Sequence, residues 1–238
     1  MKILSIDTST KNFSLAVSDN QRVLRYRNIH LDKVLESSII PAIEGILKSA
    51  NVRFKDLDGF AVGLGPGSFT SLRVGLSTIK AFVLSTGKPV VGISSLDVVA
   101  ANALGEDCDE ICVVMDARRN LLYSCIYDQG KDGLFRKSEP MLIGLDDLLG
   151  RVCGRTLFVG DAVSLNREAI KAKYQKASVK GSSCEPLFAE EKTGIPQARK
   201  LSALAYRRFC KKEYDDSETL VPVYLYAQDC QVQTKKHV

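Results

Sequence analysis

The chain has 238 residues, of which 45% are hydrophobic and 26% charged, with a formal net charge of +5. This length suits one large domain or two small ones, and the modest charge permits RNA contact without arguing for it. Apolar runs fall well short of the ~20 residues that span a bilayer, so we expect no membrane segment. Two histidines, His30 and His237, are too few for a multi-histidine metal site. Seven scattered cysteines are typical of reduced thiols in a cytoplasmic protein.

The first hundred residues predict the element order β-β-β-α-β-α-β-α. Phe13, Leu15 and Val17 alternate with smaller residues, which is typical of a strand with one buried face. Pro41 lies inside the first expected helix, so that helix either kinks or starts after an earlier turn. We expect strands at 2–7, 13–18, 22–28, 57–64 and 89–93, and helices at 32–49, 69–84 and 95–103. Ser94 or Ser95 can cap the last of these helices.

A glycine-rich loop, GPGSFTSLRVG at residues 65–75, joins the fourth strand to the second helix. Gly65 and Gly67 permit backbone angles closed to other residues, and Ser68 or Thr70 can cap the helix. A glycine turn before a helix suggests an anion cradle. However, no lysine follows in the register of a phosphate-binding P-loop, so the loop alone does not indicate catalysis.

The helix after this loop is apolar or small on two sides. Its first side suits packing on its own sheet and comprises Leu72, Leu76, Ile79 and Val83. Its second side comprises Ser71, Val74, Gly75, Thr78 and Phe82. A helix of this kind is buried on both sides. Either another protein or the helix at 32–49 covers the second side, and periodicity favours neither.

After residue 105 the pattern restarts. Asp116 follows an apolar strand as Asp7 does, and an ungapped overlay also matches Asp19 with Asp128. This repeat suggests a duplicated domain. Further along, we expect a strand at 156–160, helices at 165–174 and 198–212, and an extended segment at 222–226. We predict an N-terminal lobe at 1–105 joined by a returning helix at 198–212, a C-terminal lobe at 106–197 and a tail at 213–238.

The first turn offers an alternative chemistry. Asp7, Thr8, Ser9 and Thr10 place an acid and three hydroxyls after a strand, which could hold a nucleotide phosphate with the acid near a metal. The equivalent run at 116–120 lacks glycine and hydroxyls. A small-molecule kinase or nucleotidase that uses the Asp7 hairpin is therefore the second hypothesis.

The glycine loop resembles the signature of the TsaB (YeaZ) family, accessory subunits of the bacterial machinery that makes threonylcarbamoyladenosine in tRNA. The likeness lies in Gly65 to Thr70 and Leu72 to Gly75, with further matches at 6–9, 89–96, 116–118 and 222–225. Ser71 stands where the family usually has glycine. The resemblance implies an α/β fold of two duplicated lobes of the actin/Hsp70/sugar-kinase-like (RNase H-like) type.

The resemblance also implies a non-catalytic role in the cytoplasm, with no catalytic residue, metal or cofactor in this chain. The expected partner is a TsaD-like catalytic subunit, which binds the metal and transfers threonylcarbamoyl to the tRNA adenosine next to the anticodon. This chain would bind that subunit as a heterodimer and activate it. A TsaE-like ATPase would join the pair, tRNA would be contacted indirectly, and the isolated chain could form a homodimer.

We expect the partner interface to lie on the helices at 69–84 and 32–49, where small residues let two helix backbones approach closely. Its predicted residues are Ser68, Phe69, Ser71, Val74, Gly75, Thr78, Phe82, Leu35 and Ile39. On this hypothesis, a Gly75→Arg or Val74→Glu change abolishes the complex and leaves the monomer folded.

Overall fold

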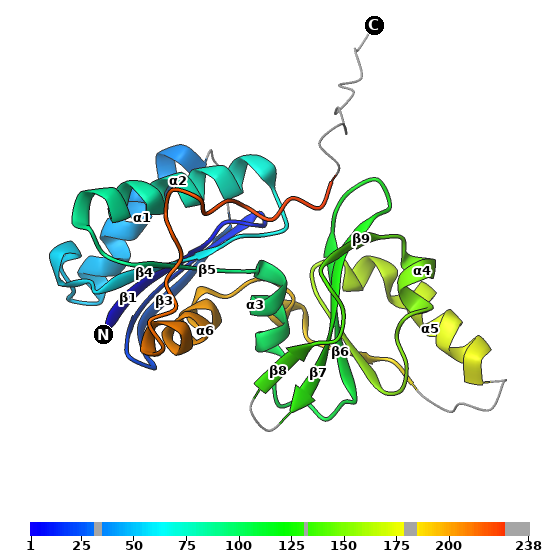
Figure 1. The fold of residues 1–238 in the computed structure, drawn as a ribbon. Coiled ribbons are helices and arrows are strands. Elements are labelled where there is room, and N and C mark those ends of the chain that lie inside the picture. Colours follow the sequence, from blue (N-terminus) through cyan, green and yellow to red (C-terminus); the bar gives the residue numbers. More distant parts are fainter. Residues whose placement is uncertain (31–34, 131–132, 179–184, 227–238) are drawn as a thin grey trace, which may run out of the picture.

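The protein folds into two α/β lobes, each built on one sheet (Figure 1). The computed structural model describes residues 1–30, 35–130, 133–178 and 185–226, with the backbone alone for Glu36 and residues 176–178. The elements are β1 (Lys2–Asp7), β2 (Asn12–Asp19), β3 (Arg22–His30), α1 (Leu35–Ser49), η1 (Phe54–Asp56), β4 (Gly59–Gly63), α2 (Phe69–Thr86), β5 (Val90–Ile93), α3 (Ser95–Asn102), β6 (Glu110–Asp116), β7 (Leu122–Gly130), β8 (Gly133–Arg136), β9 (Met141–Ile143), α4 (Leu145–Leu149), β10 (Thr156–Val159), α5 (Val163–Ser178), β11 (Leu187–Phe188), η2 (Glu191–Thr193) and α6 (Ala198–Cys210).

The two sheets share one topology. The first has the strand order β3-β2-β1-β4-β5, and the second has β11-β10-β6-β7-β8 with β9 also paired to β7. In each, the first strand lies antiparallel to the second and parallel to the strand that follows the first helix. The duplication that the sequence suggests is therefore present in the topology.

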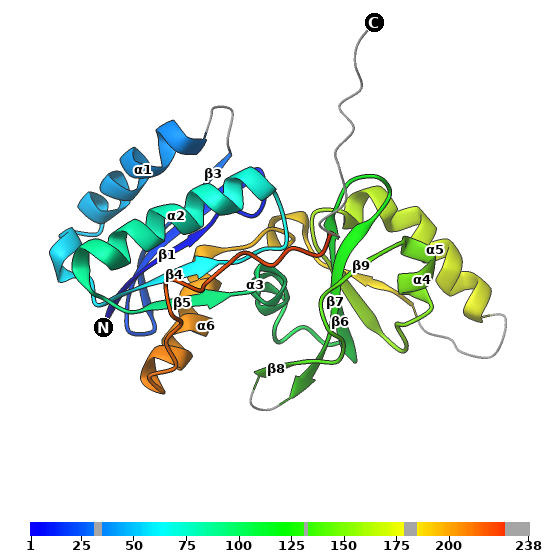
Figure 2. The same ribbon diagram turned by 45° about the horizontal axis from the view of Figure 1, so that its top comes forward.

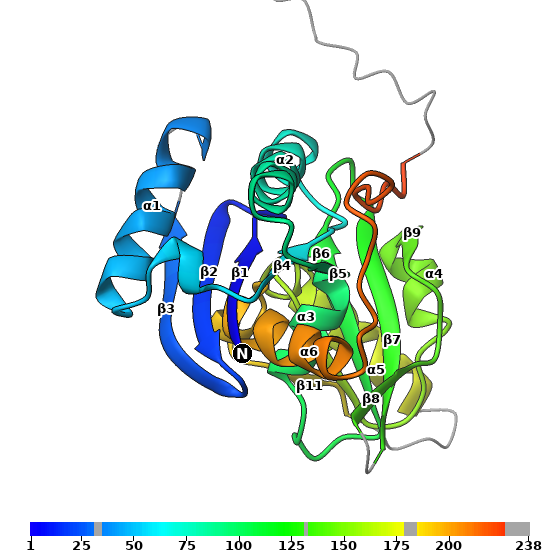
Figure 3. The ribbon, with the colours of Figure 1, turned by 60° about the vertical axis from the view of Figure 1, so that its left-hand side comes forward.

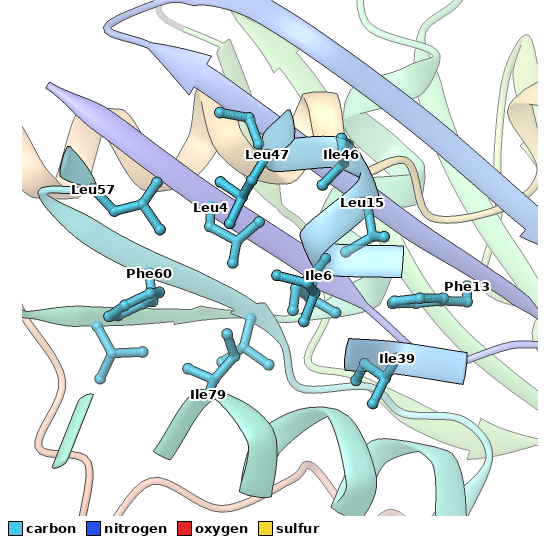
Figure 4. Packing of buried hydrophobic residues seen from close by; sticks show 14 of the residues in the cluster. Leu4, Ile6, Phe13, Leu15, Ile39, Ile46, Leu47, Leu57, Phe60 and Ile79 are labelled. Atoms are coloured by element: carbon cyan, nitrogen blue, oxygen red, sulfur yellow. The ribbon is translucent and has the colours of Figure 1, made fainter. Parts of the chain in front are cut away.

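Helices α1 and α2 lie side by side on one face of the first sheet (Figures 2 and 3). Because side chains alternate along a strand, Leu4 and Ile6 of β1 point to this face, where they meet Ile39 of α1 and Ile79 of α2 (Figure 4). All four side chains are at most 2% exposed. This apolar layer fixes α1 and α2 on the sheet.

Helices α3 and α6 connect the lobes. Helix α6 follows the second sheet in sequence, yet its Leu201 and Phe209 pack on the other face of the first sheet. Helix α3 follows the first sheet, and its Leu96 and Val99 join the core of the second. Each lobe thus sends its third helix to the inner side of the other (Figure 1). The boundary between the two lobes at residue 105 stays a proposal.

The ungapped overlay of the two halves is wrong by one residue in the first strand. Asp7 pairs with Ser14 around a turn of residues 8–13, whereas Asp116 pairs with Leu122 around the shorter turn 117–121. By alternation along their strands, Asp7 points away from α1 and α2, whereas Asp116 points to the face that α4 and α5 cover. The two acids are therefore not equivalent in direction.

Most predicted elements lie within a few residues of the observed ones. Helix α1 is continuous through Pro41, and the predicted start at 32–34 lies outside the described residues. Ser94 caps α3, since its Oγ accepts the Leu96 N–H at 3.3 Å. The predicted extended segment 222–226 joins no sheet. The short elements β8, β9, α4 and β11 were not predicted from the sequence.

Residues 213–226, here called the C-terminal strap, run from α6 back across both lobes (Figure 1). The Asp215 N–H donates to the Val90 carbonyl at 2.9 Å, and the Val223 N–H donates to the Leu64 carbonyl at 2.8 Å. At its end, the Tyr226 hydroxyl donates to the Ala117 carbonyl at 2.6 Å. The strap therefore fastens the second lobe to the first.

No helix in the described ranges is long and apolar enough to cross a membrane. The cysteines with described side chains are free thiols, and burial raises the pKa of Cys112 to about 12.

Candidate functional site

The Asp7 carboxylate lies buried where the first strand turns into the hairpin. Its side chain is 1% exposed. Oδ1 accepts from the Ser9 N–H at 2.9 Å and the Ser9 hydroxyl at 2.6 Å, and Oδ2 accepts from the Ser95 hydroxyl at 2.7 Å. Burial raises the pKa of Asp7, and the bonds from Ser9 and Ser95 oppose that rise. Both carboxylate oxygens are thus used within the chain.

The hairpin hydroxyls are also engaged internally. The Thr8 hydroxyl donates to the Ser71 carbonyl at 2.8 Å, and the Thr10 hydroxyl lies 3.1 Å from both the N–H and the carbonyl of Asn12. Thr8 and Ser9 are almost fully buried, and Thr10 is 9% exposed. The hydroxyls that a phosphate would use already bond within the protein.

Two glycines let the loop and α2 pack directly on this hairpin. A Cβ at Gly67 would overlap the Ser9 carbonyl, and a Cβ at Gly75 would overlap the Thr8 hydroxyl. The Ser68 N–H donates to the same Ser9 carbonyl at 2.7 Å. The glycines of the signature therefore bring two backbones together inside the chain.

A cleft of about 700 Å³ separates the hairpin from the second lobe. Ser9 and Thr10 border it on one side, and Asp116, Arg118 and Asp161 border it on the other. Asp161 Oδ1 accepts the Asp116 N–H at 2.9 Å, and burial followed by the Asp116 charge raises the pKa of Asp161. Nucleotide binding in this cleft stays a prediction.

The nine predicted interface residues differ in solvent exposure and fall into three groups. Ser68 and Phe69 are exposed, Phe69 by 52%. The half-buried residues are Ser71, Val74, Thr78 and Phe82, and the buried residues are Leu35, Ile39 and Gly75. The sequence set therefore mixes surface positions with core positions.

The buried members have clear local partners. Leu35 and Ile39 are four residues apart, on the inner face of α1, and join the core beneath it. Phe82 packs on Phe54 and Phe60, with ring centroids 4.8 and 5.8 Å away. For Phe82 and Gly75, the chain itself covers the second side of α2.

Sequence reasoning missed the most exposed apolar residues of the two helices. Leu84 of α2 is 89% exposed, and Ile40 of α1 is 43% exposed. Ser77 and Ala81 precede Leu84 at helical spacing and are also exposed. The helical spacing of these three residues could have shown from the sequence alone that they share one side of α2. We name the outward residues Ile40, Ser77, Ala81 and Leu84, with half-buried Val74 and Thr78, the α1–α2 face.

Phe69 lies at the start of α2, where the strap crosses it. Its ring centroid is 5.2 Å from that of Tyr224, and the Arg73 guanidinium stacks 3.8 Å from the Phe69 centroid. The Arg73 Nε–H also donates to the Tyr224 hydroxyl at 3.2 Å. The strap thus partly covers one predicted interface residue. Among the described residues, His, Cys, Asp and Glu side chains form no group of three that could hold a metal.

Comparisons with known proteins place the chain in a family. The sequence model described as "TsaD: tRNA N6-adenosine threonylcarbamoyltransferase" matches residues 32–235. The tRNA threonylcarbamoyladenosine biosynthesis protein TsaB of Bacillus subtilis (strain 168) is 29% identical over 229 residues, which cover 94% of each chain. The chain belongs to the TsaB (YeaZ) family. The resemblance seen in the glycine loop is thereby confirmed.

Solved structures agree in fold with this TsaB-family chain. YeaZ from Pseudomonas aeruginosa superposes with a TM-score of 0.75 at 21% identity, over 94% of this chain and 99% of that one. A putative N-acetylmannosamine kinase from Listeria monocytogenes gives a TM-score of 0.51 at 12% identity, over 90% and 100%. The predicted two-lobed, sugar-kinase-like α/β fold is confirmed.

Proposed function

We propose that this protein is a non-catalytic subunit in the biosynthesis of tRNA threonylcarbamoyladenosine in the cytoplasm. It binds and activates a TsaD-like catalytic subunit, which transfers threonylcarbamoyl to the adenosine next to the anticodon. The name of the Bacillus subtilis relative supports the pathway. The observation that carries the docking role is the exposed α1–α2 face.

The composition of α2 supports a docking role. Only Arg73 and Lys80 are charged among its 18 residues. Leu84 and Ile40 are exposed at the outer surface of this face, and Leu84 stands at helical spacing from the exposed Ser77 and Ala81. Removing such side chains from water contributes about 25 cal/mol per Å² before the costs of association. Small residues such as Ser77 and Ala81 allow a partner helix to approach closely.

The choice of partner rests on shared fold. This chain matches the sequence model of TsaD itself, so a TsaD subunit is expected to carry its own pair of helices at the places of α1 and α2. Two such pairs can pack face to face in a nearly two-fold arrangement. For the same reason, we expect a weaker homodimer when the partner is absent.

The hairpin supports a role without catalysis. The Asp7 oxygens and the Thr8 hydroxyl are already hydrogen-bonded inside the chain, so phosphate binding there would have to break those bonds. From the family resemblance we further propose that a TsaE-like ATPase joins the pair and that the partner makes the main tRNA contacts.

The second candidate is a small-molecule kinase or nucleotidase. The cleft of about 700 Å³ beside Ser9 and Thr10, together with the kinase-like fold, favours it. Calorimetry of the isolated chain with magnesium and ATP separates the two proposals. Tight binding with turnover would support the kinase and overturn the non-catalytic role.

The direct test of the proposed function is reconstitution. A TsaD-like subunit and a TsaE-like ATPase are assayed for threonylcarbamoylation of tRNA with and without this chain, after capture of the TsaD-like subunit on the immobilised chain. We expect capture and a strong dependence of modification on the chain. Full modification without it, or failure of capture, would contradict the proposal.

A further inference from the structure

A second pocket lies on the side of the first sheet away from α1 and α2. Its volume is about 440 Å³, within the range of small-molecule sites. Helix α6 forms one wall, and α3 with β7 and β8 forms the other. Figure 1 shows these elements converging below the first sheet, between the lobes. The pocket shares no lining residue with the cleft beside the Asp7 hairpin.

The pocket is strongly basic. Lys200, Arg207 and Arg208 of α6 and Arg136 of β8 line it, and Asp97 of α3 is the one acid among the described lining residues. Asp97 is already fully engaged by the chain. Arg136 donates to its two oxygens at 2.8 and 2.7 Å, and the Tyr127 hydroxyl donates to Oδ1 at 2.8 Å.

Two of the cations differ from the others in having no anionic partner among the described residues. Arg208 donates to both oxygens of Asp215, whereas the side chains of Lys200 and Arg207 make no hydrogen bond or ion pair with the described part of the chain. They stand seven residues apart on one side of α6, so both face the pocket. Lys200 is half-buried, and burial followed by the Arg199 charge lowers its pKa. An anion between the two cations would offset this desolvation.

The remaining walls are apolar. Leu134 of β8 and Leu204 of α6 line the pocket, and Leu104, just after α3, is 41% exposed at its edge. These side chains suit a hydrocarbon or ring rather than a bare inorganic ion.

We propose that this pocket binds a small organic anion, in which a carboxylate or a phosphate monoester lies between Lys200 and Arg207 and an apolar group contacts Leu134 and Leu204. The two headgroups share the chemistry that these cations recognise, and the probes below distinguish them. The site stands independently of the α1–α2 face, and it is tested on the isolated chain.

Calorimetry with phenyl phosphate and with benzoate tests the proposal, with inorganic phosphate and benzyl alcohol as half-ligands. We expect at least one of the two aromatic anions to bind with a Kd of about 1 mM or lower and each half-ligand to bind at least about tenfold more weakly. The better of the two anions identifies the headgroup. The proposal would be overturned if neither aromatic anion gave binding heat at about ten times this Kd. It would also be overturned if inorganic phosphate bound as tightly as the better aromatic anion.

Variants locate the binding. Lys200→Gln combined with Arg207→Gln is expected to weaken binding of the better anion by more than about tenfold. Ala203→Phe keeps both charges but fills the pocket, and should have a similar effect. Lys211→Gln makes the same charge change on an exposed residue just after α6 and should bind normally. Circular dichroism checks that each variant is folded. Equal weakening by Lys211→Gln, or normal binding by folded Ala203→Phe, would contradict the site.

Discussion

Helices α2 and α5 occupy the same place in the two lobes, yet they differ in how many charged residues they carry. Among the 16 residues of α5, Arg167, Glu168, Lys171, Lys173 and Lys176 are charged, against two charged residues in α2. Their companions differ as well, since α1 has 15 residues and α4 has 5. The sheet requires only one apolar side from each helix, so the fold does not explain the outward surface of α1 and α2. The docking role that we propose would explain it.

The largest expected effect concerns the inner side of α2. Gly75→Arg should destabilise the monomer by about 3 kcal/mol or more, because any Cβ there overlaps the Thr8 hydroxyl. This corrects the expectation that the variant leaves the monomer folded. Urea unfolding measures the change. Ser77→Arg, on the outward side of the same helix, should stay within about 0.5 kcal/mol. Equal stability of the two variants would contradict the assignment of sides.

Phe82 tests whether a residue predicted for the interface belongs to the core instead. Phe82→Ala should cost about 2 kcal/mol of stability, because its half-buried ring packs on Phe54 and Phe60. Phe135→Ala removes a ring that is 54% exposed on β8 and should cost well under about 1 kcal/mol in the same urea titration. If the two losses match, Phe82 does not belong to the core as described.

The homodimer is the next effect in size. Sedimentation of the isolated chain over a range of concentrations should show reversible dimers, which Leu84→Glu weakens by about tenfold or more. Leu165→Glu places the same charge on α5, where the leucine is 82% exposed, and should leave the dimer unchanged. A strict monomer at high concentration, or equal sensitivity to both variants, would show that α2 and α5 do not differ in this respect.

The smallest effect comes from an exposed ion pair beside the first sheet. Arg53 bonds Asp56 at 2.8 Å and lowers the pKa of Asp56 from 3.8 to about 2. Because the folded pKa is lowered, the pair stabilises the fold above pH 3.8, and this contribution disappears as pH falls through about 2. Urea unfolding of wild type and Asp56→Asn should therefore show a small difference at pH 5 that closes toward pH 2. A difference that grows on acidification would contradict this sign.

The sequence predicted the order of elements in the first lobe because its strands alternate clearly and end at turn residues. The cap at Ser94 followed from the same kind of local rule. Strands as short as β11, with two residues, and β9, with three, carry too little pattern to detect. The overlay of Asp7 with Asp116 failed because the second turn is one residue shorter, which no periodicity reveals.

The site was harder to predict than the fold. Helix α2 has small or apolar residues on every side, so periodicity could not show that Gly75 faces Thr8 while Ser77 faces outward. That distinction depends on where the Asp7 hairpin lies, which is set by contacts far apart in sequence. The hairpin itself was found correctly as a cluster of acid and hydroxyls, but its internal hydrogen bonds were not foreseeable.

The central claim is that the α1–α2 face binds a TsaD-like subunit. The most direct measurement is the affinity of that subunit, determined by titration, for wild type, for Ile40→Glu combined with Leu84→Glu, and for Leu165→Glu. Our account predicts that the double variant binds more than about tenfold more weakly and that Leu165→Glu binds like wild type. Wild-type affinity in the double variant, or an equal loss in Leu165→Glu, would contradict it.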